Sequence, residues 1–267
     1  MPKIDRQYRF DVRQFVRRVK GEVTLPIIQD RFVASNQYVA ILNSLLKGIV
    51  SYFRQTVLPA YTVYISDAED DGSWFIALEK VVPEYVAEAK GKVEPIIRSE
   101  ARYHTKKFKQ GVKKKLKTNI DNLINEQQLE NVIQDSIDRN GSLIKGLADD
   151  TLKGIKETVF SAKSNGQSVR TLASRLRYNF DISSKRAKFI ARDQMAKLNA
   201  DLNKSRSQQI GSDYYYWRDM GDSRVRPLHR TLNGRKYRWD ESTDAEGGLE
   251  PGGPPNCRCI AETIIDF

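Results

Sequence analysis

Apolar residues recur at helical spacing through most of the first 210 residues of the chain. In residues 25–58 they fall three or four positions apart, and Pro59 follows as a stop because proline cannot continue a helix. Residues 70–73 then predict a turn with Ser73 as the N-cap of a second helix, which Pro83 is expected to kink or end. The apolar positions of the first stretch are Val39, Leu42, Leu45, Leu46, Ile49, Val50 and Phe53.

Five further helices are expected before residue 211. The first of them, over residues 93–123, carries an apolar stripe that steps by four. Asparagine–glycine pairs and serine caps divide the rest, because these residues favour helix ends over helix interiors. The stripe consists of Tyr103 or His104, Phe108, Val112, Leu116 and Ile120. The divisions are the Asn140-Gly141 stop, the Ser142 cap, the Asn165-Gly166 stop, the Ser168 cap, a cap at Ser183 or Ser184, and the Gly211 C-cap.

The apolar period changes near residue 211. Residues 214–217 are a run of aromatics typical of a strand, and Asn233-Gly234 is a hairpin signal with a return strand over 235–239. Residues 240–256 are rich in glycine and proline and predict an irregular loop, and residues 257–265 alternate as a closing strand.

These patterns predict an α+β chain in two parts. The first, residues 1–141, is a predominantly helical and basic N-terminal region. The second, residues 142–267, is a small C-terminal α+β module with helices over 142–210 and a short antiparallel sheet within 212–267.

Positive charge is concentrated before the change of period. Residues 212–267 carry a net charge of −2, which leaves +13 for the first 211 residues of a chain with +11 in total. Residues 98–117 alone hold nine Lys or Arg and one Glu, so the expected helix there has a cationic ridge behind its apolar stripe. We expect this ridge to contact a polyanion, DNA first and without sequence preference, although a merely solvated helix face is the alternative. The DNA-contact candidates are Arg98, Arg102, Lys106, Lys107, Lys109, Lys113, Lys114, Lys115 and Lys117.

Metal chemistry is available at one constellation, His229 with Cys257 and Cys259. Two thiols and an imidazole could hold zinc, with Asp222 or Asp219 as the candidate fourth ligand. The alternative is a pair of packed, reduced thiols beside a hydrogen-bonded histidine, with no cofactor. In both interpretations the three side chains are expected to lie close together.

Asp222, Arg224, Arg226 and His229 also suggest an active site, because an acid, two cations and an imidazole could bind and cleave a phosphodiester. The alternative is a loop ordered by arginine–carboxylate pairs. The chain has neither a carboxylate cluster nor a second histidine near His229, so the structural interpretation is favoured and no enzymatic activity is expected.

The remaining composition narrows the class of protein. Two cysteines do not make a disulfide framework, and a reducing site of synthesis is the default. No apolar run approaches the ~20 residues that a membrane span needs, so no membrane partner is expected.

An ordered set of motifs runs from the last expected helix towards the C-terminus. It contains I-A-R-D-Q-M over 190–195, D-S-R-V-R-P-L-H over 222–229 and P-N-C-R-C over 255–259. Together with Asn199, Gly211 and the Asn233-Gly234-Arg235 turn, this set resembles the phage Mu F-like module of phage minor head, or head morphogenesis, proteins, which include the SPP1 type. The motif residues are Trp217, Asp222, Arg224, Arg226, His229, Gly234, Pro255, Cys257 and Cys259.

This resemblance covers about residues 142–267 and implies a low-copy structural protein at the portal end of a double-stranded DNA phage head. It implies roles in head morphogenesis and in DNA packaging and ejection, with the portal protein and other head proteins as partners. It places the protein in the virion, assembled in the host cytoplasm, and implies no settled enzymatic activity. Two other classes stay open: a nuclease or transferase that uses the 222–229 loop, and a plain nonspecific DNA-binding protein.

Overall fold

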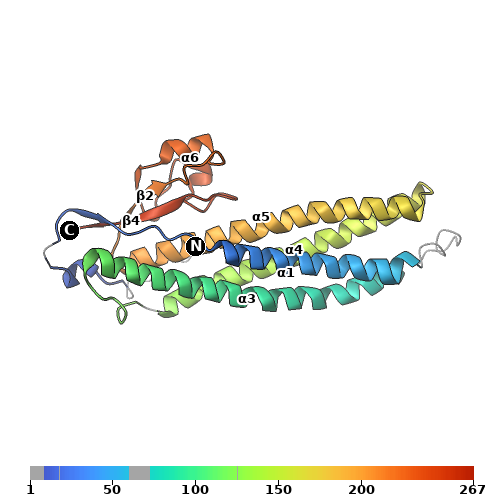
Figure 1. Cartoon of the computed structure of the whole chain (residues 1–267), viewed down its shortest axis with the longest axis horizontal. Helices are drawn as coiled ribbons and strands as arrows, with labels where there is room; N and C mark the ends of the chain where they lie inside the picture. The colour runs from blue at the N-terminus through green and yellow to red at the C-terminus, as the bar shows by residue number, and fades with distance from the viewer. Residues whose placement is uncertain (1–8, 18, 60–72, 125) are drawn as a thin grey trace. The chain divides into compact units, whose positions relative to one another are not determined.

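The computed structural model describes residues 9–17, 19–59, 73–124 and 126–267. Long helices dominate these residues, and a small sheet is formed mainly by the C-terminal part of the chain (Figure 1). The α+β class is therefore confirmed. The long helices are α1 (Phe32–Tyr52), α3 (Ser73–Leu116), α4 (Glu126–Ser164) and α5 (Val169–Gln209). The short helical elements are η2 (Val12–Phe15), the π-helical η3 (Phe53–Val57), α6 (Pro227–Leu232) and η4 (Glu246–Gly248).

The chain divides into two compact units, each built from separate stretches of sequence. Unit 1 combines residues 1–34, 97–137 and 192–267, and unit 2 combines residues 35–96 and 138–191. Unit 2 is helical, whereas unit 1 holds the sheet. The expected boundary at residue 142 concerned the start of the C-terminal module, and it stays a prediction.

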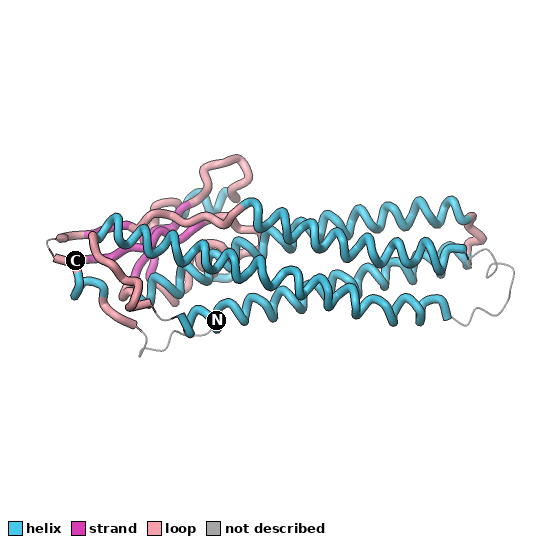
Figure 2. Tube along the Cα trace, turned by 60° about the horizontal axis from the view of Figure 1, so that its bottom comes forward, coloured by secondary structure: helices cyan, strands magenta, loops and turns pink. Residues whose placement is uncertain are grey.

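The sheet of unit 1 has four antiparallel strands in the order β1-β4-β2-β3. Figure 2 shows its strands in magenta. Its strands are β1 (Glu22–Thr24), β2 (Tyr214–Arg218), β3 (Lys236–Arg238) and β4 (Ile260–Asp266). Tyr214 pairs with Ile264 on one side and with Arg238 on the other. The short antiparallel sheet is confirmed, but β1 was not predicted, because three residues are too few for an alternating pattern to show.

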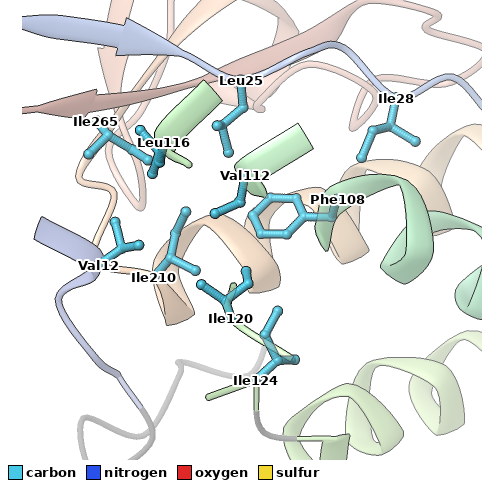
Figure 3. Packing of buried hydrophobic residues seen from close by; sticks show 10 residues of the cluster. All are labelled: Val12, Leu25, Ile28, Phe108, Val112, Leu116, Ile120, Ile124, Ile210 and Ile265. Carbon is cyan, nitrogen blue, oxygen red and sulfur yellow. The ribbon is translucent and has the colours of Figure 1, made fainter. Parts of the chain in front are cut away.

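The core of unit 1 is organised by the stripe predicted over residues 93–123. Phe108, Val112 and Leu116 are buried along one face of α3 (Figure 3). Each lies four positions after the last, so successive side chains fall on the same helical face. The other members of the cluster are Val12, Leu25, Ile28, Ile120, Ile124, Ile210 and Ile265.

Several expected helix ends are wrong. Pro83 does not end a helix, because α3 continues through both Pro83 and Pro95 to Leu116. Both prolines are exposed, and so are Glu79 and Gly91, whose carbonyls lose their helical N–H partner. Water can solvate those carbonyls, which makes the interruptions tolerable.

The Asn140-Gly141 stop and the Ser142 cap are also wrong, since α4 runs through them. Asn140 is buried, and its Oδ1 accepts a hydrogen bond from the Tyr38 hydroxyl at 2.6 Å. Asn140 thus satisfies a buried hydroxyl of unit 2 instead of ending the helix. Ser142 Oγ donates to the carbonyl of Asp138 within the same helix.

Ser183 and Ser184 likewise do not cap a separate helix, because α5 is continuous from Val169. Ser184 Oγ instead donates to Asn43 Oδ1 at 2.9 Å within unit 2. A serine that could cap the end of an isolated helix here hydrogen-bonds a side chain of a neighbouring helix.

Other expected ends are confirmed. The Asn165-Gly166 stop follows the end of α4, and the Ser168 hydroxyl accepts from the Thr171 N–H at 3.3 Å as the N-cap of α5. Gly211, with φ of 85°, follows α5 as expected of a C-cap glycine.

Two bounds shift. The first helix begins at Phe32 instead of residue 25, and α3 ends at Leu116 instead of 123, where Lys117 takes a φ of 55°. The expected turn and cap at 70–73 lie outside the residues whose side chains the structure describes.

Candidate metal centre

His229 lies on α6, a six-residue helix that begins at Pro227. Proline suits this first position because its fixed φ is helical and its missing N–H would have no partner there. The Asn233-Gly234 turn therefore follows a helix and not a strand, so the expected simple hairpin is wrong. Gly234, with φ of 82°, donates its N–H to the Trp217 carbonyl at 2.8 Å and starts the return to β3.

Cys257 and Cys259 lie just before β4, and not within a closing strand that begins at 257 as expected. Both thiols are buried and face the buried ring of His229. The distances from His229 Nδ1 to the two Sγ atoms are 3.4 and 3.5 Å, and the three candidate ligand atoms lie within 4.8 Å of one another. The expected closeness of the three side chains is confirmed; bound metal stays a prediction.

Glu246, from η4, fixes the orientation of the histidine. Its Oε2 lies 2.5 Å from His229 Nε2, and its Oε1 lies 3.6 Å from Arg226 Nε. The His229 hydrogen bond, with help from the Arg226 charge, lowers the pKa of Glu246, which is therefore a carboxylate acceptor. His229 Nε2 therefore faces this carboxylate, and Nδ1 faces the two sulfurs.

Trp217 of β2 closes the centre from another side. Its ring meets the His229 ring edge to face at 5.2 Å, and it packs in one cluster with both cysteines. The Trp217 Nε1–H is fully buried and has no hydrogen-bond partner of ordinary geometry within the described residues.

The two thiols also affect each other. Cys259, as a hydrogen-bond donor, lowers the pKa of Cys257, and the Cys257 thiolate together with burial raises the pKa of Cys259.

Asp222 is not brought to the cysteines. Its two oxygens accept from the Arg258 guanidinium at 2.8 and 2.6 Å, and Oδ1 also accepts from the Arg224 N–H at 3.0 Å. The Arg258 bonds are the main reason that the pKa of Asp222 is lowered. Asp219 instead accepts from the Gly221 N–H at 2.9 Å. Neither aspartate belongs to the metal-ligand group found among the described residues, so neither is placed as a fourth ligand.

The segment that carries the cysteines is anchored on both sides. Arg226 Nη2 donates to the Pro255 carbonyl at 2.6 Å, and the Asn256 N–H donates to Asp193 Oδ1 at 2.6 Å. Asp193 lies on α5, and its other oxygen accepts from Lys197. Asp193 of the first motif therefore meets the 222–229 and 255–259 motifs at one place in unit 1.

Sequence reasoning missed Glu246, Arg258 and the role of Asp193. Asp193 and Arg258 lie inside the recognised motifs, but the sequence does not show which residues they pair with. Glu246 stands in a glycine-rich loop that has no period to show which way a side chain points.

A pocket of about 120 Å³ opens beside the centre. His229, Cys257 and Cys259 form part of its lining, together with the three arginines Arg224, Arg226 and Arg258 and the residues Val225 and Asn256. The pocket therefore combines two sulfurs and an imidazole with positive charge.

Acidic residues pair with two of the cations of the ridge on α3. Arg98 pairs with Glu130 at 2.7 Å, and Lys109 lies 3.5 Å from Glu126 and 3.8 Å from Asp121. These two cations line a groove of about 520 Å³ with those three acids. The remaining seven candidates are exposed and form no ion pair within the described residues: Arg102, Lys106, Lys107, Lys113, Lys114, Lys115 and Lys117.

No helix within the described residues is long and apolar enough to cross a membrane.

Part of the chain that includes this centre is similar to known proteins. Residues 153–262 match the family described as phage Mu protein F like protein. An uncharacterized protein of Haemophilus influenzae (strain ATCC 51907 / DSM 11121 / KW20 / Rd) is 33% identical over 128 residues, which cover 48% of this chain and 28% of that protein. The chain thus spans little more than a quarter of the length of this curated relative. No solved structure matches the chain significantly.

Proposed function

Because residues 153–262 match the family described as phage Mu protein F like protein, we propose that this chain is a minor structural protein of a double-stranded DNA phage head. In this proposal it associates with the portal and other head proteins during head morphogenesis, and it contacts DNA during packaging or ejection. The family match carries the head-related part of the proposal.

The ridge on α3 supports the DNA contact. Seven exposed cations stand on one helix and its first following residue, and the buried stripe of Phe108, Val112 and Leu116 holds that helix in the core of unit 1. Phosphate contacts need positive charge and no particular base, so the contact is nonspecific. Arg98 and Lys109 are left out of the proposed contact set, because their charges are matched by acids.

Salt dependence tests this contact on the full chain. Binding of a short duplex, followed by fluorescence anisotropy from about 50 to 200 mM salt, should weaken with a log–log slope of about −5 if some six phosphates are neutralised. Replacing Lys113, Lys114 and Lys115 by Ala should flatten the slope by up to about three units, while the helix content is kept because Ala is a good helix former.

A matched control distinguishes the loss of contacts at α3 from the loss of net charge as the cause of a flatter slope. Lys47, Lys80 and Lys185 are exposed lysines of unit 2, and replacing all three by Ala removes the same charge. The slope of this control should stay close to that of the wild type. Equal flattening in both variants, or no binding at about 50 mM salt, would contradict the proposed contact.

The enzyme alternative is less well supported by the geometry. Asp222 is held by Arg258, Arg226 donates to a backbone carbonyl, and His229 is buried against Glu246. These groups satisfy one another, as in a loop ordered for structure. We expect no cleavage of plasmid DNA with or without divalent ions; cleavage that disappears in His229→Ala would establish the enzyme instead.

A further inference from the structure

We propose that Cys257, Cys259 and His229 bind one zinc ion, through the two Sγ atoms and Nδ1, and that the fourth coordination position faces the arginine-lined pocket. This inference stands on the geometry of the centre and does not depend on the proposed head function. It adds a metal site to a module for which the family match names none.

The spacing of the three atoms fits tetrahedral zinc. Zinc–sulfur bonds of about 2.3 Å and zinc–nitrogen bonds of about 2.05 Å place nitrogen about 3.6 Å from each sulfur at a tetrahedral angle. The His229 Nδ1 to Sγ distances of 3.4 and 3.5 Å differ from that value by no more than about 0.2 Å. The two nitrogen-to-sulfur distances therefore need little change to fit around one ion.

Hydrogen bonding alone explains the arrangement less well. His229 Nδ1 offers one in-plane direction for a hydrogen bond, whereas both sulfurs approach it at nearly equal distance. One such direction serves one sulfur well, but a metal ion between the three atoms would use both sulfurs and the nitrogen at once. The near equality of the two distances is what coordination requires.

Groups around the three ligands act as their supports. Glu246 accepts from His229 Nε2–H, which is the carboxylate–histidine arrangement that orients a metal-binding imidazole. The Trp217 Nε1–H is buried beside Cys259 without an ordinary partner, and a metal-bound thiolate is an acceptor that would satisfy it. One bound zinc ion would account for both the Glu246–His229 hydrogen bond and the buried Trp217 N–H.

The donor set selects the metal and predicts an open position. Two thiolates and an imidazole suit zinc, while magnesium and calcium prefer oxygen. Neither Asp222 nor Asp219 belongs to the group of candidate ligand atoms that lie within 4.8 Å of one another among the described residues. The centre instead borders the pocket with Arg224, Arg226 and Arg258, so water or a small anion would complete the tetrahedron.

Metal analysis of the full chain tests the site directly. Protein stripped with a chelator under reducing conditions and dialysed against zinc should retain one zinc per chain. Cobalt(II) in place of zinc should give a near-ultraviolet thiolate-to-cobalt charge-transfer band and intense visible bands of a tetrahedral ion. A folded wild-type chain that retains no zinc and shows no thiolate-to-cobalt band would overturn the proposal.

Variants then assign the ligands. Cys257→Ser and Cys259→Ser should each lose the stoichiometric ion, and Glu246→Gln should weaken zinc binding about 10- to 100-fold as a positioning residue. Asp222→Asn is the control, because it removes a nearby carboxylate that is not a ligand, and it should keep one zinc. If a cysteine variant fails to fold, the cobalt spectrum of the wild type still decides the matter.

Azide probes the fourth position. If that position opens to the pocket, millimolar azide should shift the visible bands of the cobalt protein, and replacing Arg226 by Ala should weaken the shift. Visible bands that stay unchanged at saturating azide would refute the open position.

Discussion

At the scale of single residues, His104 is a buried base without a partner. Its side chain is 1% exposed, and neither ring nitrogen has a hydrogen-bond partner within the described residues. Burial, together with the nearby Arg206 charge, lowers the pKa of His104 to about 3. Its ring stacks on Phe108 at 6.4 Å, which makes it part of the packed face of α3.

This histidine should make the protein less stable in mild acid. The unfolded chain takes up a proton near pH 6.5 but the folded chain does so only near pH 3, so the free energy of unfolding falls as the pH drops through that window. Between pH 7 and pH 5 the loss from this group should be about 2 kcal/mol. Urea unfolding at both pH values measures it.

His104→Leu is the matched variant, because leucine is apolar, of similar size and does not titrate. The other histidine, His229, is unchanged in it, so the difference between the two pH profiles isolates His104. A variant that loses as much stability as the wild type between pH 7 and pH 5 would show that His104 is protonated when folded.

At the scale of elements, Pro83 costs α3 stability. A proline inside a helix is about 3 kcal/mol less favourable than alanine, part of which is offset because proline also restricts the unfolded chain. Pro83 is exposed, so Pro83→Ala should leave the packing unchanged and raise the free energy of unfolding by about 1 to 3 kcal/mol. Chemical denaturation measures the change.

A residue on the same helix provides the opposite case. Phe108 is buried in the core of unit 1, and Phe108→Ala should lower the free energy of unfolding by about 3 to 5 kcal/mol. If Pro83→Ala also destabilises the protein, the backbone shape that proline imposes on α3 is needed for the packing of unit 2.

The same elements show what a sequence can specify. The stripe of Phe108, Val112 and Leu116 was predictable, because helical period alone puts these residues on one face. The continuity of α4 was not, because Asn140 carries a local end signal that the Tyr38 hydroxyl overrides from another helix. Local signals fix helix interiors, while helix ends depend on partners distant in sequence.

The candidate site divides in the same way. His229, Cys257 and Cys259 could be grouped from residue chemistry, since few side chains bind soft metals. Their support by Glu246 could not, because the irregular glycine-rich loop has no period to show which of its acids faces His229. Asp222 was misjudged for a related reason: its actual partner, Arg258, lies 36 residues away.

At the scale of the whole molecule, the charged residues after residue 211 and the cations on α3 differ in how many of them form ion pairs. Acids outnumber bases after residue 211, yet many of these charges pair within the module, as Arg218 does with Glu262 and Arg235 with Asp244. On α3 the seven exposed cations have no such partners within the described residues. Net charge alone would not reveal this contrast, which is the basis for proposing that a polyanion binds at α3 and not at the module.

The proposed zinc ion should also appear in the stability of the chain. A ligand that binds the folded state alone adds about 2.7 kcal/mol at a free concentration one hundred times its Kd. Its three ligands come from α6 and from the segment before β4, so removing the ion would release the connection that holds these two segments against Trp217. A chelator should therefore lower the Tm of the reduced full chain, and added zinc should restore it. The double variant Cys257→Ser with Cys259→Ser should unfold at one temperature whether chelator or zinc is present. A wild-type Tm that ignores both, in protein shown by metal analysis to change its zinc content, would mean that the ion binds without stabilising the module.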